Sequence, residues 1–103
     1  MSKVAAVAKL TAADGQRDAL VKVMEQLVDA AADEGGTELY VLNLDNKDAN
    51  VIWFYELYTD QDALNAHGQS ETMKAIGGQL GGLLGGAPEL NFLTPHRAAG
   101  VDL

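Results

Sequence analysis

The side chain best suited to acid–base chemistry in this chain is His67. It stands just before Gly68 at the end of an expected short helix, whereas the second histidine, His96, follows Pro95 near the C-terminus. An imidazole with an ordinary pKa of about 6.5 takes up and releases a proton at neutral pH. His67 is therefore a candidate general base. A histidine that caps a helix or hydrogen-bonds the backbone would have the same sequence context, so both interpretations stay open.

Aromatic side chains gather in the segment 51–58. Alternation along a strand places Trp53 and Tyr55 on one face. There they could stack on a planar ligand and donate N–H and O–H hydrogen bonds, or serve as ordinary core or dimer contacts. Asn43, a polar residue in the apolar run 37–44, needs a hydrogen-bond partner. Either a ligand or the nearby turn could supply it.

The opposite face of the segment 51–58 carries Glu56 and Tyr58. Burial would raise the pKa of a carboxyl in such an apolar strand and could make Glu56 a second acid or base. An ion pair that ties the strand to its surroundings is the simpler account. We count Tyr55, Tyr40, Tyr58 and Glu56 as candidate substrate contacts.

The composition argues against several other kinds of site. There is no cysteine, hence no disulfide, iron–sulfur cluster or thiol nucleophile. Two separated histidines and scattered acids lack metal-ligand spacing, and no glycine-rich phosphate loop is followed by lysine. The formal net charge is -8, and the seven Lys and Arg are not clustered as binding to nucleic acid or an anionic membrane requires. We expect no metal, no cofactor, no nucleic acid and no membrane partner.

The elements that must position these residues follow from hydrophobic spacing. Val4 to Leu10 predicts a buried strand, and neither a signal peptide nor a spanning helix is recognisable, which favours a cytoplasmic protein. A helix is predicted from Thr11 to the pair Gly35-Gly36. Its apolar face carries Leu20, Met24, Leu27, Val28 and Ala31. The whole chain predicts one domain over residues 1–95 and a loose tail over 96–103.

The second half of the chain is also predicted to contain strands and helices. The segments 37–44 and 51–58 flank a polar turn, which predicts an antiparallel hairpin. A short helix is predicted from the Thr59–Asp62 start through His67, another from Ser70, and a last strand over 89–93. The second of these helices is expected to carry Met73, Ile76, Leu80, Leu83 and Leu84. The glycine-rich stretch 77–86 is either a mobile lid or a site of close packing or fraying.

The order β-α-β-β-α-β predicts a ferredoxin-like α+β fold: a four-stranded antiparallel sheet with the helices on one face. The other face would carry too much Val, Leu and aromatic surface to remain in water. A second copy is the obvious cover. We therefore expect a homodimer in which two sheets pack face to face as a dimeric α/β barrel.

The segment VIWFYELYTDQDALNAH at 51–67, followed by SETMK at 70–74, resembles the central signature of the antibiotic biosynthesis monooxygenase (ABM) family. In that family a strand with an aromatic-x-x-Glu core runs into D-x-x-A-L-x-x-H and then a Ser-led helix. The D-G-x-R-D-x-L, E-x-G-T and P-E-L stretches of this chain agree as well. The resemblance implies a dimeric ferredoxin-like barrel. Members include oxygenases that need no cofactor and act on quinols and polyketide phenols, haem-degrading enzymes, and proteins with no known substrate.

The resemblance favours one of these activities over another. Haem-degrading members have Trp, His and Asn where this chain has Tyr58, Ile76-Gly77 and Ala8 or Lys9, so haem degradation is not expected. Phenol-oxidising members resemble this chain at Trp53 and at Asn43.

We therefore expect a cofactor-independent monooxygenase that oxidises a hydroquinone or polycyclic phenol with O₂. His67 would be the base or a donor, Trp53 and Tyr55 the aromatic wall of a pocket between sheet and helices, and Asn43 an orienting group. One alternative is a non-catalytic dimeric α/β barrel that binds a small hydrophobic ligand. Another is isomerase or lyase chemistry on the same fold, which would need a base but no O₂.

Overall fold

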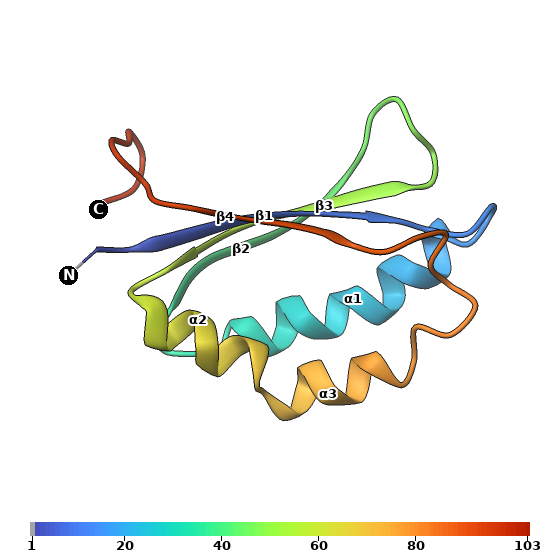
Figure 1. Cartoon of the computed structure of the whole chain (residues 1–103), viewed down its shortest axis with the longest axis horizontal. Helices are drawn as coiled ribbons and strands as arrows, with labels where there is room; N and C mark the ends of the chain where they lie inside the picture. Colours follow the sequence, from blue (N-terminus) through green and yellow to red (C-terminus); the bar gives the residue numbers. More distant parts are fainter. Residues whose placement is uncertain (1) are drawn as a thin grey trace.

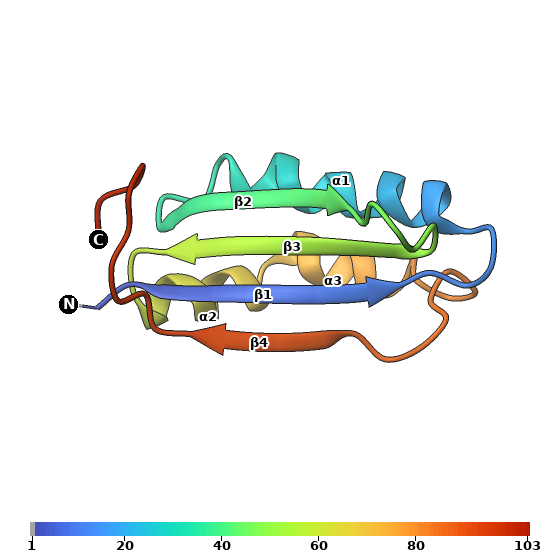
Figure 2. The same ribbon diagram turned by 90° about the horizontal axis from the view of Figure 1, so that it is seen from above.

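A computed structural model describes residues 2–103 as a four-stranded antiparallel sheet with three helices on one of its faces (Figures 1 and 2). The elements are β1 (Val4–Thr11), α1 (Arg17–Ala31), β2 (Thr37–Leu44), β3 (Val51–Tyr58), α2 (Gln61–Gly68), α3 (Glu71–Gly77) and β4 (Glu89–Leu93). The strand order is β2-β3-β1-β4. This confirms the predicted ferredoxin-like α+β fold. Residues 94–103 contain neither helix nor strand, and the proposed domain boundary at residue 95 stays a prediction.

The register of β1 with its neighbours sorts the side chains of the sheet into two faces. Ala8 pairs with Phe54 on one side and with Leu90 on the other, and all pairings are antiparallel. Even-numbered residues of these three strands therefore share one face, and odd-numbered residues share the other. Ala8 and Phe54 belong to the core that α1 covers, so the even-numbered face is the helix face. The odd-numbered face is the outer face of the sheet.

Helix α1 packs on the sheet through one buried side, which includes Leu20, Met24 and Leu27. It begins at Arg17 rather than at Thr11, because β1 continues to Thr11 and the chain then turns through Gly15, whose φ is +76°. The Arg17 guanidinium donates to the backbone carbonyls of Asp45 and Asp48, each at 3.2 Å. The start of α1 is thereby tied to the β2–β3 hairpin.

The polar turn between β2 and β3 is organised by Asp45. Its Oδ1 accepts hydrogen bonds from the backbone N–H groups of Lys47 and Asp48, and its Oδ2 accepts one from the Trp53 indole at 2.8 Å. The Asp48 N–H, the Trp53 N–H and the Lys47 N–H together lower the pKa of Asp45 to about 2. The predicted hairpin is confirmed.

The two short helices begin where the sequence predicts them. Asp60 caps α2 by accepting from the Ala63 N–H at 2.8 Å, and Ser70 caps α3 by accepting from the Met73 N–H at 3.2 Å. Helix α3 ends at Gly77, short of the predicted extent to Leu84, because consecutive glycines make further turns of helix unfavourable. No helix among residues 2–103 is long and apolar enough to cross a membrane.

The rest of the glycine-rich stretch docks on the end of β1. The N–H of Ala13 donates to Leu83 at 2.8 Å, and the N–H of Gly85 donates to Thr11 at 2.7 Å. A Cβ on Gly85 would lie 2.8 Å from the carbonyl oxygen of Ala12, so only glycine fits there. These contacts favour the close-packing interpretation over that of a mobile lid.

The loop between α1 and β2 also approaches its neighbour closely. A Cβ on Gly36 would lie 2.4 Å from the Cβ of Ala63 in α2, whereas a Cβ on Gly35 would meet nothing within 4 Å. Gly36 also accepts a hydrogen bond from the Thr59 N–H at 2.9 Å. The loop is thus pressed against the first turn of α2.

We predict that Gly36→Ala lowers the free energy of unfolding by about 1–3 kcal/mol, because the added methyl group forces the loop and α2 apart. The matched control is Gly35→Ala, which should leave stability unchanged or raise it by up to about 1 kcal/mol. Urea unfolding of both variants measures the difference. Equal stability of the two variants would show that the close contact is not rigid.

Candidate active site

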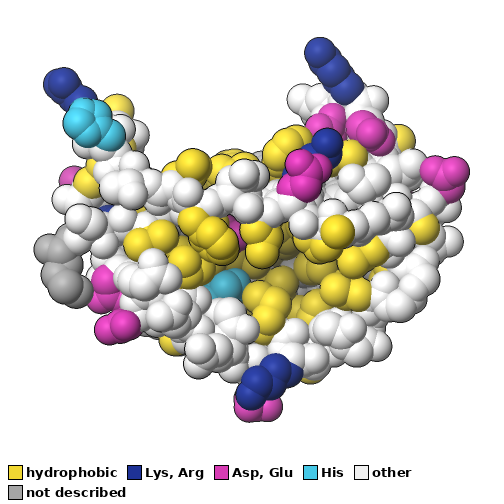
Figure 3. All heavy atoms as spheres, viewed as in Figure 1, with side chains coloured by type: hydrophobic (Ala, Val, Ile, Leu, Met, Phe, Trp, Pro, Cys, Tyr) yellow, Lys and Arg dark blue, Asp and Glu magenta, His cyan; other side chains and the backbone are white. Residues whose placement is uncertain are grey.

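A cavity of about 290 Å³ lies between the helix face of the sheet and the helices. It is lined by β1, β4 and all three helices, and by Tyr40, Phe54 and Glu56 from β2 and β3. Figure 3 looks into the hollow, whose walls are mostly apolar. Two lining residues of the edge strand β4 are well exposed, Leu90 at 61% and Phe92 at 59%, so the cavity opens beneath β4. No Lys or Arg lines it.

Small side chains on the central strand make room for this hollow. Ala6 and Ala8 of β1 are buried and line the cavity, where larger residues would fill it. The volume is at the small end of the range of about 300–1,000 Å³ that is usual for ligand sites. It suits a compact ring system rather than a large cofactor.

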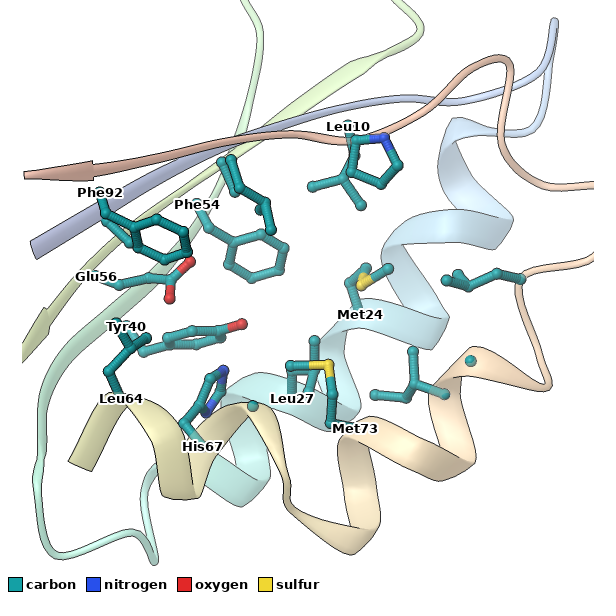
Figure 4. A pocket seen from close by; sticks show the side chains of 18 residues that line it. Leu10, Met24, Leu27, Tyr40, Phe54, Glu56, Leu64, His67, Met73 and Phe92 are labelled. Atoms are coloured by element: carbon teal, nitrogen blue, oxygen red, sulfur yellow. The ribbon is translucent and has the colours of Figure 1, made fainter. Parts of the chain in front are cut away.

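His67 is the buried polar side chain of the cavity. It lies in the last turn of α2, is 4% exposed, and has its Nδ1 2.7 Å from Oε1 of Glu34 in the α1–β2 loop. Its Nε2 is buried and has no hydrogen-bond partner among the described residues. Figure 4 shows the ring projecting from α2 into the cavity, toward Tyr40 and Glu56. A buried nitrogen without a partner suggests that a bound molecule completes the site.

Two tyrosines and a glutamate lie across from His67. The ring centroid of Tyr40 is 4.8 Å from that of His67, and the centroid of Tyr58 is 5.5 Å from it. The Tyr58 hydroxyl donates to Oε1 of Glu56. Figure 4 shows the Glu56 carboxyl and the Tyr40 hydroxyl pointing into the cavity. The site therefore combines an imidazole, a carboxyl and a phenol in apolar surroundings.

Burial dominates the ionisation of these groups. It raises the pKa of Glu56, and the hydrogen bond from Tyr58 and the nearby His67 oppose the rise. Burial also raises the pKa of Tyr40 well above its ordinary value, helped by the charges of Glu56 and Glu34. The pKa of Tyr58 is raised by burial and by its bond to Glu56. Both phenols thus stay neutral and can donate hydrogen bonds, and Glu56 takes up a proton more readily than an exposed glutamate.

The structure brings part of the sequence-predicted set together. His67, Tyr40 and Glu56 line one cavity, and Tyr58 lies behind Glu56 without lining it. This arrangement unites residues from α2, β2 and β3.

Trp53, Tyr55 and Asn43 are placed elsewhere, which corrects the expectation that they wall the same pocket as His67. They lie on the outer face of the sheet, and none lines the cavity. The Asn43 side chain donates to the backbone carbonyls of Val41 and Trp53, each at 3.1 Å, and the Trp53 indole is bonded to Asp45. The physical reason is the alternation of β3, whose even-numbered side chains meet the helices.

Sequence reasoning missed Glu34 and the apolar walls supplied by Met24, Met73 and Phe92. The sequence feature that could have marked Glu34 as a site residue is the E-x-G-T stretch at 34–37, which lies in a polar loop. Within residues 2–103, no group of three or more His, Cys, Asp or Glu side chains could hold a metal ion.

Comparisons with known proteins agree with this architecture. Residues 3–78 match the family model described as antibiotic biosynthesis monooxygenase. No curated protein matches the sequence significantly.

Several solved structures are similar over nearly their whole length. A Caulobacter crescentus protein assigned provisionally to antibiotic biosynthesis monooxygenases is 29% identical, with a TM-score of 0.87, and 93% of this chain and 92% of that chain are covered. A Chloroflexus aurantiacus protein with the same provisional assignment is 26% identical, with a TM-score of 0.80 and coverage of 98% and 100%. Rv0793 from Mycobacterium tuberculosis is 25% identical, with a TM-score of 0.87 and coverage of 96% and 100%.

The raised pKa of Glu56 predicts a pH dependence of stability. The unfolded chain releases this proton near the ordinary value of 4.5, whereas the folded chain holds it to higher pH. The contribution of Glu56 to the free energy of unfolding therefore falls as pH rises from 4.5 through the raised pKa. Glu56→Gln, whose amide oxygen can still accept from Tyr58, should remove this decline.

Urea unfolding between pH 4.5 and pH 8 measures the effect. Glu25→Gln, which removes an exposed carboxyl of α1, is the matched control and should keep the decline of the unmodified protein. A Glu56→Gln protein with the same pH dependence as the unmodified protein would contradict the prediction.

Proposed function

Because this chain belongs to the antibiotic biosynthesis monooxygenase family, we propose that it is a cofactor-independent monooxygenase that oxidises a hydroquinone or polycyclic phenol with O₂. The observation that carries the proposal is the buried Nε2 of His67, which has no hydrogen-bond partner among the described residues, in a mostly apolar cavity. Such a site can bind a flat ring and remove a proton from it.

In this reaction the main contribution of the protein is to remove a proton from the substrate. A phenolate gives an electron to O₂ far more readily than the neutral phenol does. Nε2 of His67 takes the phenolic proton, and positioned general bases of this kind typically accelerate a reaction by about 10²–10⁴-fold. The apolar walls keep water away and strengthen the electrostatic interactions around the phenolate.

The overall reaction balances without a further reductant. A hydroquinone with a free ring carbon and one O₂ give a hydroxyquinone and one water, and the substrate supplies all four electrons. One oxygen atom forms the new C–O bond, and the other leaves as water after accepting protons. Glu56, whose pKa is raised by burial, is placed to deliver a proton, and the Tyr40 hydroxyl can donate a hydrogen bond to a substrate oxygen.

The lining also restricts the substrate. Without Lys or Arg around the cavity, and with Glu56 inside it, a sulfonate or carboxylate would lose its hydration with no counter-charge. The proposed substrate is therefore an uncharged ring system. Substituents too large for the cavity would extend out of it at its opening beside Leu90 and Phe92.

We also propose that two copies associate through the outer face of the sheet. This face carries exposed Tyr55 and Leu93 together with Leu39, and its charged residues Lys9 and Glu89 lie 3.9 Å from each other. The hairpin turn and the C-terminal segment both rise on this side of the sheet (Figure 1). Two such faces packed about a two-fold axis would cover each other's apolar surface.

Oxygen uptake tests the proposed activity. With a panel of naphthohydroquinones and anthrones, we predict turnover by the unmodified protein and a loss in kcat/KM of about 10²–10⁴-fold in His67→Gln. His96→Gln changes the exposed histidine of the tail and should leave kcat/KM unchanged. Circular dichroism checks that both variants fold. The proposal fails if no compound is oxidised, or if His67→Gln is fully active.

Further measurements test the preference for an uncharged substrate and distinguish an oxygenase from an isomerase, a lyase or a ligand-binding protein. 1,4-Naphthohydroquinone and its 2-sulfonate have the same ring, and we expect the sulfonate to react on the order of 100-fold or more slowly because its charge is not compensated. Conversion of a substrate without O₂ would instead indicate an isomerase or lyase. Binding of the ring compounds without any conversion would indicate a ligand-binding barrel.

Sedimentation tests the dimer. We predict that Tyr55→Glu weakens self-association by at least about 10²-fold, because it places a charge at the centre of the proposed interface. Leu44→Glu changes an exposed apolar residue on the helix face and should sediment like the unmodified protein. A monomeric unmodified protein at micromolar concentration would rule out this association.

A further inference from the structure

The carboxylate of Glu34 has no part in the reaction as proposed so far, yet it is the polar group in contact with His67. Its Oε1 lies 2.7 Å from Nδ1 of His67 and also accepts from the Thr37 hydroxyl at 2.9 Å. The backbone carbonyl of Glu34 accepts from the Thr37 N–H at 3.1 Å. The carboxylate is thus held in place by its own loop, independently of any bound molecule.

This contact decides which nitrogen of the ring carries hydrogen. A carboxylate can only accept, so Nδ1 must donate, and the neutral ring then has its lone pair on Nε2. Nε2 is the nitrogen left without a partner in the cavity. The neutral ring therefore has a proton acceptor, rather than a donor, at Nε2.

We propose that Glu34 is the positioning residue of this site: it fixes His67 in the form with hydrogen on Nδ1 and stabilises the positive ring that proton transfer creates. The catalytic role of Glu34 rests on the proposed function, whereas its effect on the tautomer of His67 does not depend on that function. Glu34 does not touch the substrate and acts through His67.

The backbone keeps this pair together across two elements. The loop that carries Glu34 is pressed against α2 at the contact between Gly36 and Ala63, and the Thr59 N–H bonds to Gly36. Helix α2 in turn carries His67. The tight glycine contact thus joins the loop that carries Glu34 to the helix that carries His67.

Other groups around His67 reinforce the arrangement. Glu56 faces it across the cavity, and the neutral phenols of Tyr40 and Tyr58 pack against the ring. None of these groups bonds Nδ1, so Glu34 alone determines the tautomer.

Nitrogen-15 NMR of histidine-labelled protein tests the inference without any substrate. We predict hydrogen on Nδ1 of neutral His67 in the unmodified protein, a mixture of tautomers in Glu34→Gln, whose amide can accept or donate, and partial recovery in Glu34→Asp. The control is Glu38→Gln, a nearby carboxylate bonded to Lys3 and Thr59, which should leave the His67 signal unchanged.

Kinetics supply the second measurement. With a substrate found in the oxygen-uptake panel, Glu34→Gln should reduce kcat/KM on the order of 10²-fold. Hydrogen on Nε2 in the unmodified protein would overturn the proposal. So would a Glu34→Gln protein with an unchanged tautomer, or one with an altered tautomer and full activity. Because the NMR arm needs no turnover, a failure of the oxygenase proposal is distinguishable from a failure of this one.

Discussion

The packing of helices against a sheet whose central strand carries small side chains is the constraint on which the rest of this structure depends. Ala6 and Ala8 leave space between β1 and the helices, while Leu20 and Ile52 are fully buried and seal the remainder of the core. Protein interiors are otherwise close-packed, so a hollow of this size persists only where the surrounding elements hold it open. The edge strand β4, not covered by a helix, leaves one side of the hollow accessible.

Into this apolar space the fold places a few polar groups with complementary properties. Nε2 of His67 has no hydrogen-bond partner among the described residues, while Nδ1 contacts Glu34. At the other end of the polar cluster, Glu56 has a pKa raised by burial and accepts a hydrogen bond from Tyr58. In the proposed reaction His67 is the base at one end of this cluster and Glu56 the proton donor at the other, an arrangement suited to moving protons on a bound ring.

Much of this fold could be predicted from the sequence because local signals were unambiguous. The element order follows from hydrophobic spacing, and the starts of α2 and α3 follow from Asp60 and Ser70, which cap them. The site was harder to predict. Alternation shows that Trp53 and Glu56 face opposite ways, but a strand with large apolar side chains on both faces does not reveal which face meets the helices. Glu34 could not be assigned from its own neighbourhood either, because its contact with His67 arises from the folding of a loop onto a helix distant in sequence.

A crystal structure of the protein with a naphthohydroquinone bound under anaerobic conditions would test the proposed site most directly. We predict that the ring lies inside the cavity beneath β4, with one hydroxyl within hydrogen-bond distance of Nε2 of His67 and the bond between Nδ1 and Glu34 preserved. A ring stacked instead on Trp53 and Tyr55 at the outer face of the sheet, with the hollow empty, would contradict it.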